Sequence, residues 1–419
     1  MNVQKKNIFS ILSFALIISF FLGFYFNENS AGGGEGDFDH ILNNYNLIFS
    51  GTLNSIDWLQ YRDSRFPIDY YIFKFYLPAD PFFWKLNIFV ISLITPFLLF
   101  FTIQKKILLS NNFDFSKNYL LLISLFLFIS PYFRTSAFWM LRENVGFFYW
   151  IISIYFYYNL IYKDFNLYNL IISFFFSYLT FYSSVNLFIV PLTSFFLIFR
   201  FDKLFSKKNL VLIFINLIFL SPIVIFYDFF KDSLQYIQSD EVKRINFSYY
   251  KIVDFFAILL IYILPIFFCY FNFQQTKKIL TENYIKIFFF VIFFIFIFWN
   301  YSNDDLLSGG AVRKLINIII ENDMLFKLSY LGAASISLLM SFYLAYKKER
   351  ILFYILVPYS FFFCFINYVF QEYLDPLFLL FIILYSKNFL YIIKNKVIHL
   401  MTYFFLFYLS SLIYYNYFV

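Results

Sequence analysis

The chain has 419 residues, of which 62% are hydrophobic and only 14% are charged. Soluble domains carry about 45–50% apolar and about 25% charged residues, so this composition excludes an ordinary water-soluble fold. The net charge of +7 would suggest nucleic-acid binding in a soluble protein, but here we expect a lipid bilayer and no nucleic acid. The two cysteines, Cys269 and Cys364, lie in apolar runs, which excludes a disulfide framework and a Cys/His metal cluster.

Apolar stretches of about 15–22 residues recur along the whole chain. They predict an all-α fold, a polytopic transmembrane bundle of about thirteen helices that forms one domain over residues 1–419. The predicted spans are 7–26, 85–104, 118–133, 145–162, 168–182, 186–200, 209–227, 253–273, 286–300, 326–345, 351–370, 376–392 and 398–417. The first is longer than the apolar core of a signal peptide, about 7–15 residues, and lacks a small-residue cleavage site, which predicts a retained anchor.

Charges divide the connections between these spans into two alternating sets. Lysine and arginine concentrate in one set, at Lys5, Lys6, Lys105, Lys106, Lys163, Arg200, Lys208, Lys277, Lys278, Lys347, Arg350, Lys394 and Lys396. The other set carries most of the aspartates and glutamates. The positive-inside rule then predicts a multi-pass protein of the inner or plasma membrane with a cytoplasmic N-terminus and the acidic loops outside.

The longest polar stretch, 27–84, follows the first span and is therefore predicted on the outer face. The glycines at 32–34 and 36 allow tight backbone turns close to the membrane surface. The same part contains Asp37 and Asp39, which an extended backbone would place on the same side. Segments 40–50 and 70–84 are amphipathic or aromatic, so we expect short interfacial helices there. A carboxylate at this membrane face can serve as a general base, while a solvated surface acid is the alternative for each residue.

A second polar cluster joins the third and fourth spans on the same side. It contains Arg134 and Arg142, which suit phosphate oxygens, together with Glu143 as a second acid and Asn144 beside it. The alternative is that both arginines reach lipid headgroups and that Trp139 belongs to an interfacial aromatic belt.

Three further residues are candidates for substrate binding. Arg65 lies in the first outer loop, and Gln371 and Tyr373 lie on a short outer turn where they would line a sugar pocket. No cofactor is predicted with certainty. The aspartate pair offers at most a divalent-cation site through water, because His40 has no second histidine nearby.

The order of these features resembles the GT-C superfamily of membrane glycosyltransferases, which includes protein O-mannosyltransferases and lipid A aminoarabinose transferases. The resemblance covers roughly the first 200 residues and rests on Asp37-Phe-Asp39, Phe66-Pro-Ile-Asp-Tyr-Tyr71 and Pro131 to Asn144. It extends to bacterial proteins found with surface-polysaccharide enzymes, which share the Gly-Gly-Gly stretch and a Gln-x-Tyr turn. It implies a polyprenyl-phosphate-linked sugar donor, with Asp37 or Asp39 as base and Glu143 as second acid.

We therefore expect a glycosyltransferase that moves a sugar to a glycan, lipid or protein acceptor on the outer face. Replacing Asp37 or Asp39 by asparagine is predicted to abolish transfer. Two alternatives stay open. An O-antigen-type polymerase or ligase would favour a large basic outer loop in the second half of the chain, and a lipid-linked glycan flippase would favour charges at mid-membrane and repeated halves.

Overall fold

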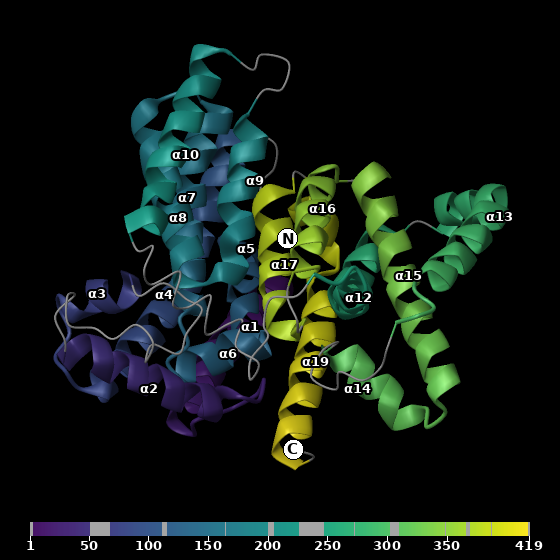
Figure 1. Cartoon of the computed structure of the whole chain (residues 1–419), viewed down its shortest axis with the longest axis horizontal. Coiled ribbons are helices and arrows are strands. Elements are labelled where there is room, and N and C mark those ends of the chain that lie inside the picture. The colour runs from purple at the N-terminus through teal and green to yellow at the C-terminus, as the bar shows by residue number, and fades with distance from the viewer. Residues whose placement is uncertain are drawn as a thin grey trace. The chain divides into compact units, whose positions relative to one another are not determined.

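The computed structural model describes residues 3–50, 68–110, 115–163, 165–199, 205–225, 247–271, 273–301, 310–347, 349–365, 369–386 and 388–417. Within these ranges every regular element is a helix and no strand occurs, which confirms the all-α prediction (Figure 1). Arg65 and the Phe66-Pro67 pair lie outside the described residues.

The chain forms two compact units, Met1–Ser239 with Phe404–Val419, and Asp240–Tyr403. The helices of the first unit are α1 (Val3–Tyr25), α2 (Gly34–Ser50), α3 (Ile68–Lys74), α4 (Pro81–Ser110), α5 (Lys117–Ser124), η1 (Leu125–Ile129), α6 (Pro131–Phe138), α7 (Glu143–Tyr162), α8 (Leu167–Ser183), η2 (Val185–Phe188), α9 (Ile189–Ile198) and α10 (Lys207–Ile225). Those of the second are α12 (Lys251–Tyr270), α13 (Phe273–Ile297), α14 (Gly310–Ile319), α15 (Asp323–Lys347), α16 (Ile351–Phe363), η4 (Gln371–Tyr373), α17 (Leu377–Tyr385), α18 (Phe389–Ile392) and η5 (Ile393–Asn395). The last helix, α19 (Val397–Tyr417), begins in the second unit and ends in the first. The prediction of a single domain stays a prediction.

Six of the described helices are long and apolar enough to cross a bilayer. They are Asn7–Tyr25, Pro81–Ser110, Glu143–Tyr162, Lys251–Tyr270, Asp323–Tyr346 and Val397–Tyr417, and two bent pairs raise the number to eight if each pair is one span. One pair is Lys117–Ile129 with Pro131–Phe138, bent by 70°. Large apolar side chains of these helices, such as Phe14, Phe101 and Leu406, are exposed, as expected where a helix faces lipid. The finer count of thirteen spans and their orientation stay predictions.

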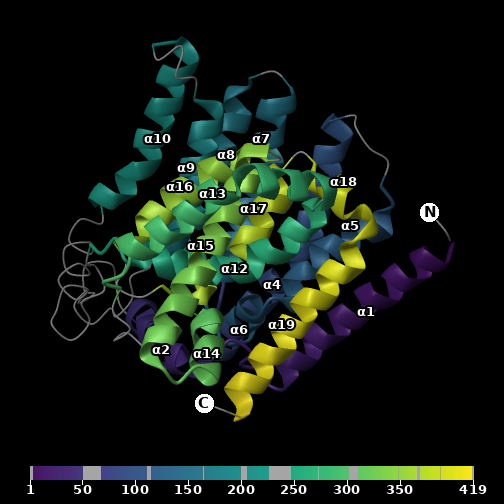
Figure 2. The ribbon, with the colours of Figure 1, turned by 90° about the vertical axis from the view of Figure 1, so that its right-hand side faces the viewer.

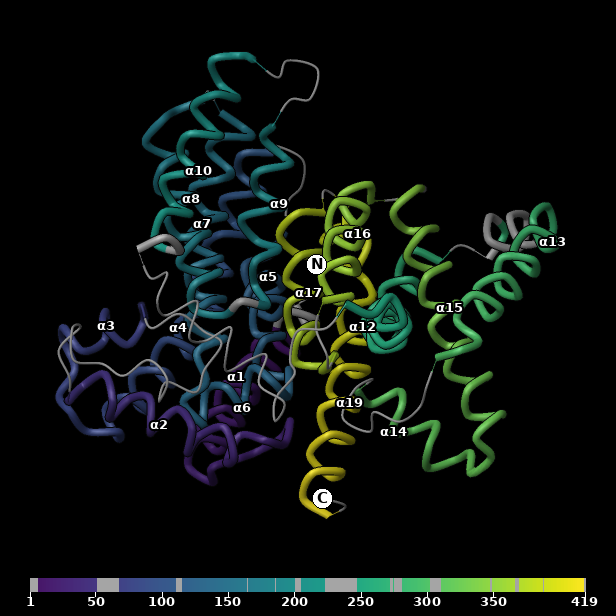
Figure 3. The backbone as a smooth tube through the Cα atoms, in the orientation of Figure 1, coloured from purple at the N-terminus to yellow at the C-terminus, as the bar shows by residue number. Residues whose placement is uncertain are grey.

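The first unit is built around α7, which packs along α8 and α4. The helix α8 also packs against α10 (Figure 3), and Figure 2 shows α19 running alongside α1. A Cβ on Gly146 of α7 would lie 2.5 Å from Leu187 and 3.6 Å from Cβ of Ser183, so this glycine lets α7 approach the end of α8 closely.

The two short helices of the first polar stretch pack on a single tryptophan of α4. Trp84 is fully buried, and its ring lies 5.4 Å from Tyr45 of α2, 4.7 Å from Tyr70 of α3 and 4.8 Å from Phe73 of α3. Such ring pairs contribute beyond their buried area, which explains why aromatic residues are dense here. Helices were predicted at 40–50 and 70–84, and the structure places them at Gly34–Ser50 and Ile68–Lys74.

One local prediction was wrong. Asp37 and Asp39 were expected on an extended backbone with both side chains on the same side. Instead both lie in α2, whose first backbone bond runs from the amide of Asp37 to the carbonyl of Gly33 at 3.0 Å. Residues two positions apart in a helix do not share a face, so these carboxylates do not form a pair.

In the second unit, α12 is the central helix and packs against α14, α15 and α16, while α13 packs on α15. Fourteen of the twenty residues of α12 are buried. Gly310 begins α14 at a positive φ of 58°, and a Cβ there would lie 3.0 Å from Oε1 of Gln371. This close approach fixes the start of α14 beside the η4 turn.

Candidate functional site

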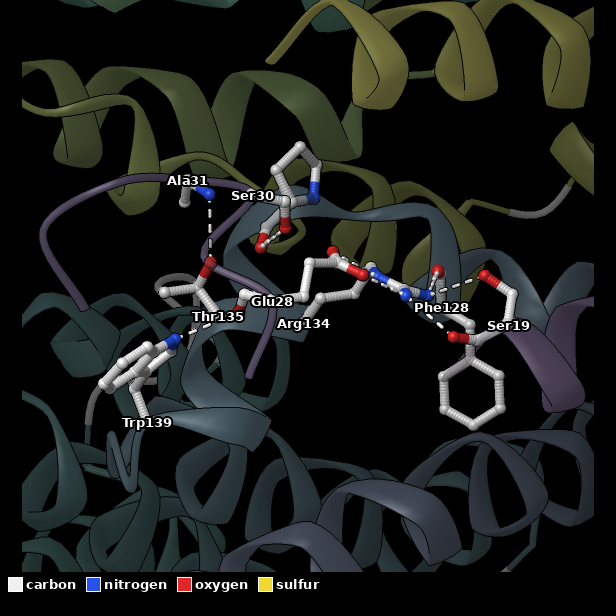
Figure 4. Close-up of polar contacts among 9 residues, drawn as sticks. Ser19, Glu28, Ser30, Ala31, Phe128, Arg134, Thr135 and Trp139 are labelled. Atoms are coloured by element: carbon white, nitrogen blue, oxygen red, sulfur yellow. Dashed lines mark hydrogen bonds and ion pairs between the residues drawn. The ribbon is translucent and has the colours of Figure 1, made fainter. Parts of the chain in front are cut away.

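Arg134 is the most completely bonded side chain of the predicted site. It is buried, and its Nε donates to Oε1 of Glu28 at 2.7 Å while Nη2 pairs with Oε2 of the same carboxylate (Figure 4). The other guanidinium hydrogens go to the carbonyls of Phe128, at 3.1 Å, and Ser19, at 2.9 Å, and to the Ser19 hydroxyl, at 3.3 Å. All five N–H donors are used, so a phosphate would have to displace Glu28.

The segment after α1 is tied to α6 by three further hydrogen bonds (Figure 4). The amide of Ala31 donates to the Thr135 hydroxyl at 2.9 Å, and the Ser30 hydroxyl donates to the carbonyl of Pro131 at 3.1 Å. The indole of Trp139 donates to the carbonyl of Glu28 at 3.0 Å. Residues 28–31 are therefore held against one face of α6, and Trp139 is fixed where α6 ends.

A cavity of about 680 Å³ lies between α1, the segment after it, the end of α6 and the C-terminal half of α19. Its lining combines carboxylates, amides and aromatic rings with a few apolar residues, namely Ser19, Leu22, Gly23, Phe26, Asn27, Glu28, Asn29, Glu35, Arg134, Trp139, Tyr408, Leu412, Tyr415 and Asn416. This volume is in the range of small-molecule sites, about 300–1,000 Å³.

Two glycines of the Gly-Gly-Gly stretch seat the aromatic walls of this cavity. A Cβ on Gly32 would lie 2.2 Å from the ring of Tyr415, and a Cβ on Gly34 would lie 2.8 Å from the ring of Trp139. Gly32 and Gly33 also have a φ of +73°, a conformation that only glycine adopts without strain. Tight turns were predicted at these glycines, and the backbone confirms them.

The predicted bases lie at the surface. Asp37 and Asp39 are both exposed, and neither lines the cavity, whereas Glu35 of the same helix does. Among the described residues no group of three His, Cys, Asp or Glu side chains is placed to hold a metal ion.

A different carboxylate of the same polar stretch is buried. Asp69 of α3 is 1% exposed, and neither of its oxygens has a hydrogen-bond donor among the described residues. Ser183, whose hydroxyl lies near it, donates instead to the carbonyl of Leu179 at 2.9 Å. Burial raises the pKa of Asp69 from its usual 3.8 to about 6, although the charge of nearby Arg142 and the Ser183 hydroxyl oppose this shift.

The predicted residues around the start of α7 divide by environment. Arg142 is fully buried, with its guanidinium carbon 4.6 Å from the centre of the Tyr70 ring, and Glu143 is half-buried in the first turn of α7. Asn144 is fully buried and donates to the Ser92 hydroxyl and the Phe133 carbonyl, both at 2.8 Å. Asn144 thus joins α4, α6 and α7.

The predicted sugar-pocket residues belong to the second unit. Gln371 is buried, accepts from the amide of Ala311 at 2.8 Å and donates to the Tyr262 hydroxyl at 3.1 Å. Tyr373 is half-buried, and its carbonyl accepts from the Tyr359 hydroxyl.

The second unit also contains a polar network that the sequence did not reveal. Asp254, in the first turn of α12, is fully buried and accepts hydrogen bonds from the hydroxyls of Tyr301, at 2.7 Å, and Tyr330, at 2.8 Å. Lys251 lies 3.8 Å from its other oxygen.

Sequence reasoning thus identified Arg134, Arg142 and Asn144 as unusual but missed the partners that explain them. Glu28 and Arg134 are 106 positions apart, and no local pattern connects them. Asp69 belongs to the motif Phe66-Pro-Ile-Asp-Tyr-Tyr71, and nothing in that sequence indicates that its carboxylate is buried.

No protein-family model, curated protein or solved structure matches this chain.

Proposed function

We propose that the chain is a membrane glycosyltransferase of the GT-C type that uses a polyprenyl-phosphate-linked sugar, with Asp69 as its general base. The observation that carries this proposal is the Asp69 carboxylate, which is buried, accepts no hydrogen bond from the part of the chain that the structure describes, and has a pKa of about 6. Leaving a buried carboxylate unsatisfied costs stability, and such groups concentrate at functional sites.

The missing donor is of the kind that an acceptor supplies. A hydroxyl of the acceptor would donate its hydrogen bond to Asp69 and then its proton. Its oxygen would form a bond to C1 of the sugar, and the bond from C1 to the phosphate oxygen would break, with the electron pair leaving on polyprenyl phosphate. A base whose pKa is near the working pH is suited to this proton transfer.

Arg142 supports the same reading. Its buried guanidinium is near Asp69 and Tyr70, and a guanidinium is suited to the oxygens of a departing phosphate. Arg134 is less suited, because Glu28 already neutralises it.

The test incubates the purified full chain with a panel of polyprenyl-phosphate hexoses and pentoses and with native envelope acceptors. The measured quantity is the polyprenyl phosphate that sugar transfer releases. Asp69→Asn should lower turnover by roughly 10²–10⁴-fold. The matched variants Asp37→Asn and Asp39→Asn, at exposed carboxylates, should retain most of it.

The reverse result, with loss at Asp37 or Asp39 and not at Asp69, would assign the base to α2 as the sequence predicted. Release by no form of the protein would refute glycosyl transfer. A lipid-linked glycan flippase predicts flux that Asp69→Asn leaves unchanged.

A further inference from the structure

The cavity between α1, α6 and α19 does not include Asp69, and it combines aromatic rings, among them Trp139 and Tyr415, with amide groups and carboxylates. We propose that it is a binding site for a neutral saccharide. Saccharides present apolar ring faces that stack on aromatic side chains and hydroxyl groups that both donate and accept hydrogen bonds.

The aromatic part of the cavity is built by the fold. Trp139 directly follows α6, and Tyr415 belongs to α19. The Trp139 ring rests on Gly34 and the Tyr415 ring on Gly32, where any larger residue would collide with the ring. The indole of Trp139 is further fixed by its bond to the carbonyl of Glu28. Rings held in this way lose little freedom when a ligand stacks on them.

Two cations lie at the polar part of the cavity, and both are engaged within the protein. Nζ of Lys85 donates to Oδ1 of Asn27 and lies 5.6 Å from the centre of the Trp139 ring. The only arginine in the lining, Arg134, is bonded to Glu28, and this leaves Glu35 as an exposed carboxylate.

Asn27, Asn29 and Asn416 add amide groups. The oxygens of Asn27 and Asn29 accept from Lys85 and from the amide of Gly34, and Nδ2 of Asn416 donates to the carbonyl of Leu412. A ligand would therefore meet the amide nitrogens of Asn27 and Asn29 as donors and the amide oxygen of Asn416 as an acceptor. A phosphate would meet the charge of Glu35, whereas a sugar hydroxyl would donate to it.

This assignment places saccharide binding on one side of the short connection between α6 and α7. Trp139, at its start, lines the cavity, and Arg142, at its end, lies near Asp69. Met140 between them has a φ of 64°, the left-handed conformation that turns the chain sharply. The role of the saccharide as acceptor rests on the proposed function, but its binding is measurable without transfer.

The experiment uses the immobilised full chain and the neutral di- to tetrasaccharide fraction of an acid hydrolysate of the native cell envelope, with mass spectrometry of what is retained. Wild type and Tyr417→Ala, an exposed aromatic outside the cavity, should retain the same oligosaccharide. Tyr415→Ala should lower retention by about tenfold, as expected for one lost stacking contact.

Asn416→Ala is a second lining variant, chosen because this side chain is exposed and supports no packing in the interior. It should lower retention while leaving the melting temperature of the protein unchanged. No retained oligosaccharide, equal retention by all forms, or retention of only the anionic fraction or a polyprenol would overturn the proposal. If the oligosaccharide is retained but no sugar is transferred, the saccharide site is supported and only the proposed function is contradicted.

Discussion

Asp69 and Arg142 are both buried in the first unit, and the cation of Arg142 does not offset the cost of burying the carboxylate of Asp69. The pKa of Asp69 is therefore raised, to about 6, where a salt bridge would have lowered it. The direction of the pKa shift distinguishes two kinds of buried carboxylate. A raised pKa marks one whose charge destabilises the fold, and a lowered pKa marks one whose charge stabilises it.

The first prediction concerns the pH dependence of stability. A folded-state pKa raised from 3.8 to about 6 means that the folded protein binds more protons than the unfolded chain between these values. Stability contributed by protonated Asp69 is thus present below pH 4 and is lost as the pH rises to about 6, by about 3 kcal/mol for two pKa units.

Asp69→Asn removes this cost, so its melting temperature in detergent should exceed that of wild type at pH 7 and approach it near pH 4.5. Asp39→Asn, at an exposed site on α2, should show no such difference. A lower melting temperature for Asp69→Asn at pH 7 would mean that the carboxylate holds the fold together and would weaken its assignment as a base.

The second prediction concerns the ion pair of Arg134. Arg134→Met leaves the largely buried carboxylate of Glu28 without its partner and should destabilise the protein by about 3–5 kcal/mol. The double variant Arg134→Met with Glu28→Gln should be less destabilised, because no unpaired charge is left. Free energies from denaturant titration test this, and equal values for the single and double variants would contradict it.

The third prediction concerns Asp254 in the second unit. Tyr330→Phe removes a buried hydroxyl donor to Asp254 and should cost about 1–3 kcal/mol of stability. Tyr354→Phe is the matched control in the same unit, because that ring is 48% exposed. An equally small effect of both changes would show that the network around Asp254 adds nothing measurable.

The fourth prediction tests the orientation that the charges indicate. Both native cysteines are buried, so introduced cysteines provide the labelling signal. Asp39→Cys should react with a membrane-impermeant maleimide on intact cells, whereas Lys163→Cys should react only after permeabilisation, because the positive-inside rule places Lys163 in the cytoplasm. Both positions are exposed, so accessibility within the protein does not bias the comparison. Labelling in the opposite order would reverse the predicted topology.

The helices could be predicted from the sequence because long apolar runs are a local property. The start of α2 was missed, since the glycines before Asp37 suggested a turn and the two positive φ values end just before the helix begins. The glycines therefore predicted the turn correctly, but they gave no indication that the residues directly after it are helical.

The site was predictable only in part, because burial and pairing depend on residues far apart in the chain. Arg134 was recognised as unusual, but its partner Glu28 looked like one more acid of an outer loop. Asp254 was hidden at the edge of an apolar run, and nothing nearby in sequence indicates the hydroxyls of Tyr301 and Tyr330 that bind it.

The return of the last helix to the first unit has a consequence for biosynthesis. The Ser411 hydroxyl donates to the carbonyl of Ser30 across 381 positions, and Tyr408 and Tyr415 complete the cavity wall that Trp139 begins. Contacts of such long sequence separation form late and slow folding. Until the ribosome has delivered α19, the segment after α1 lacks this wall, and a quality-control system that recognises incompletely packed membrane helices would have that whole interval in which to act.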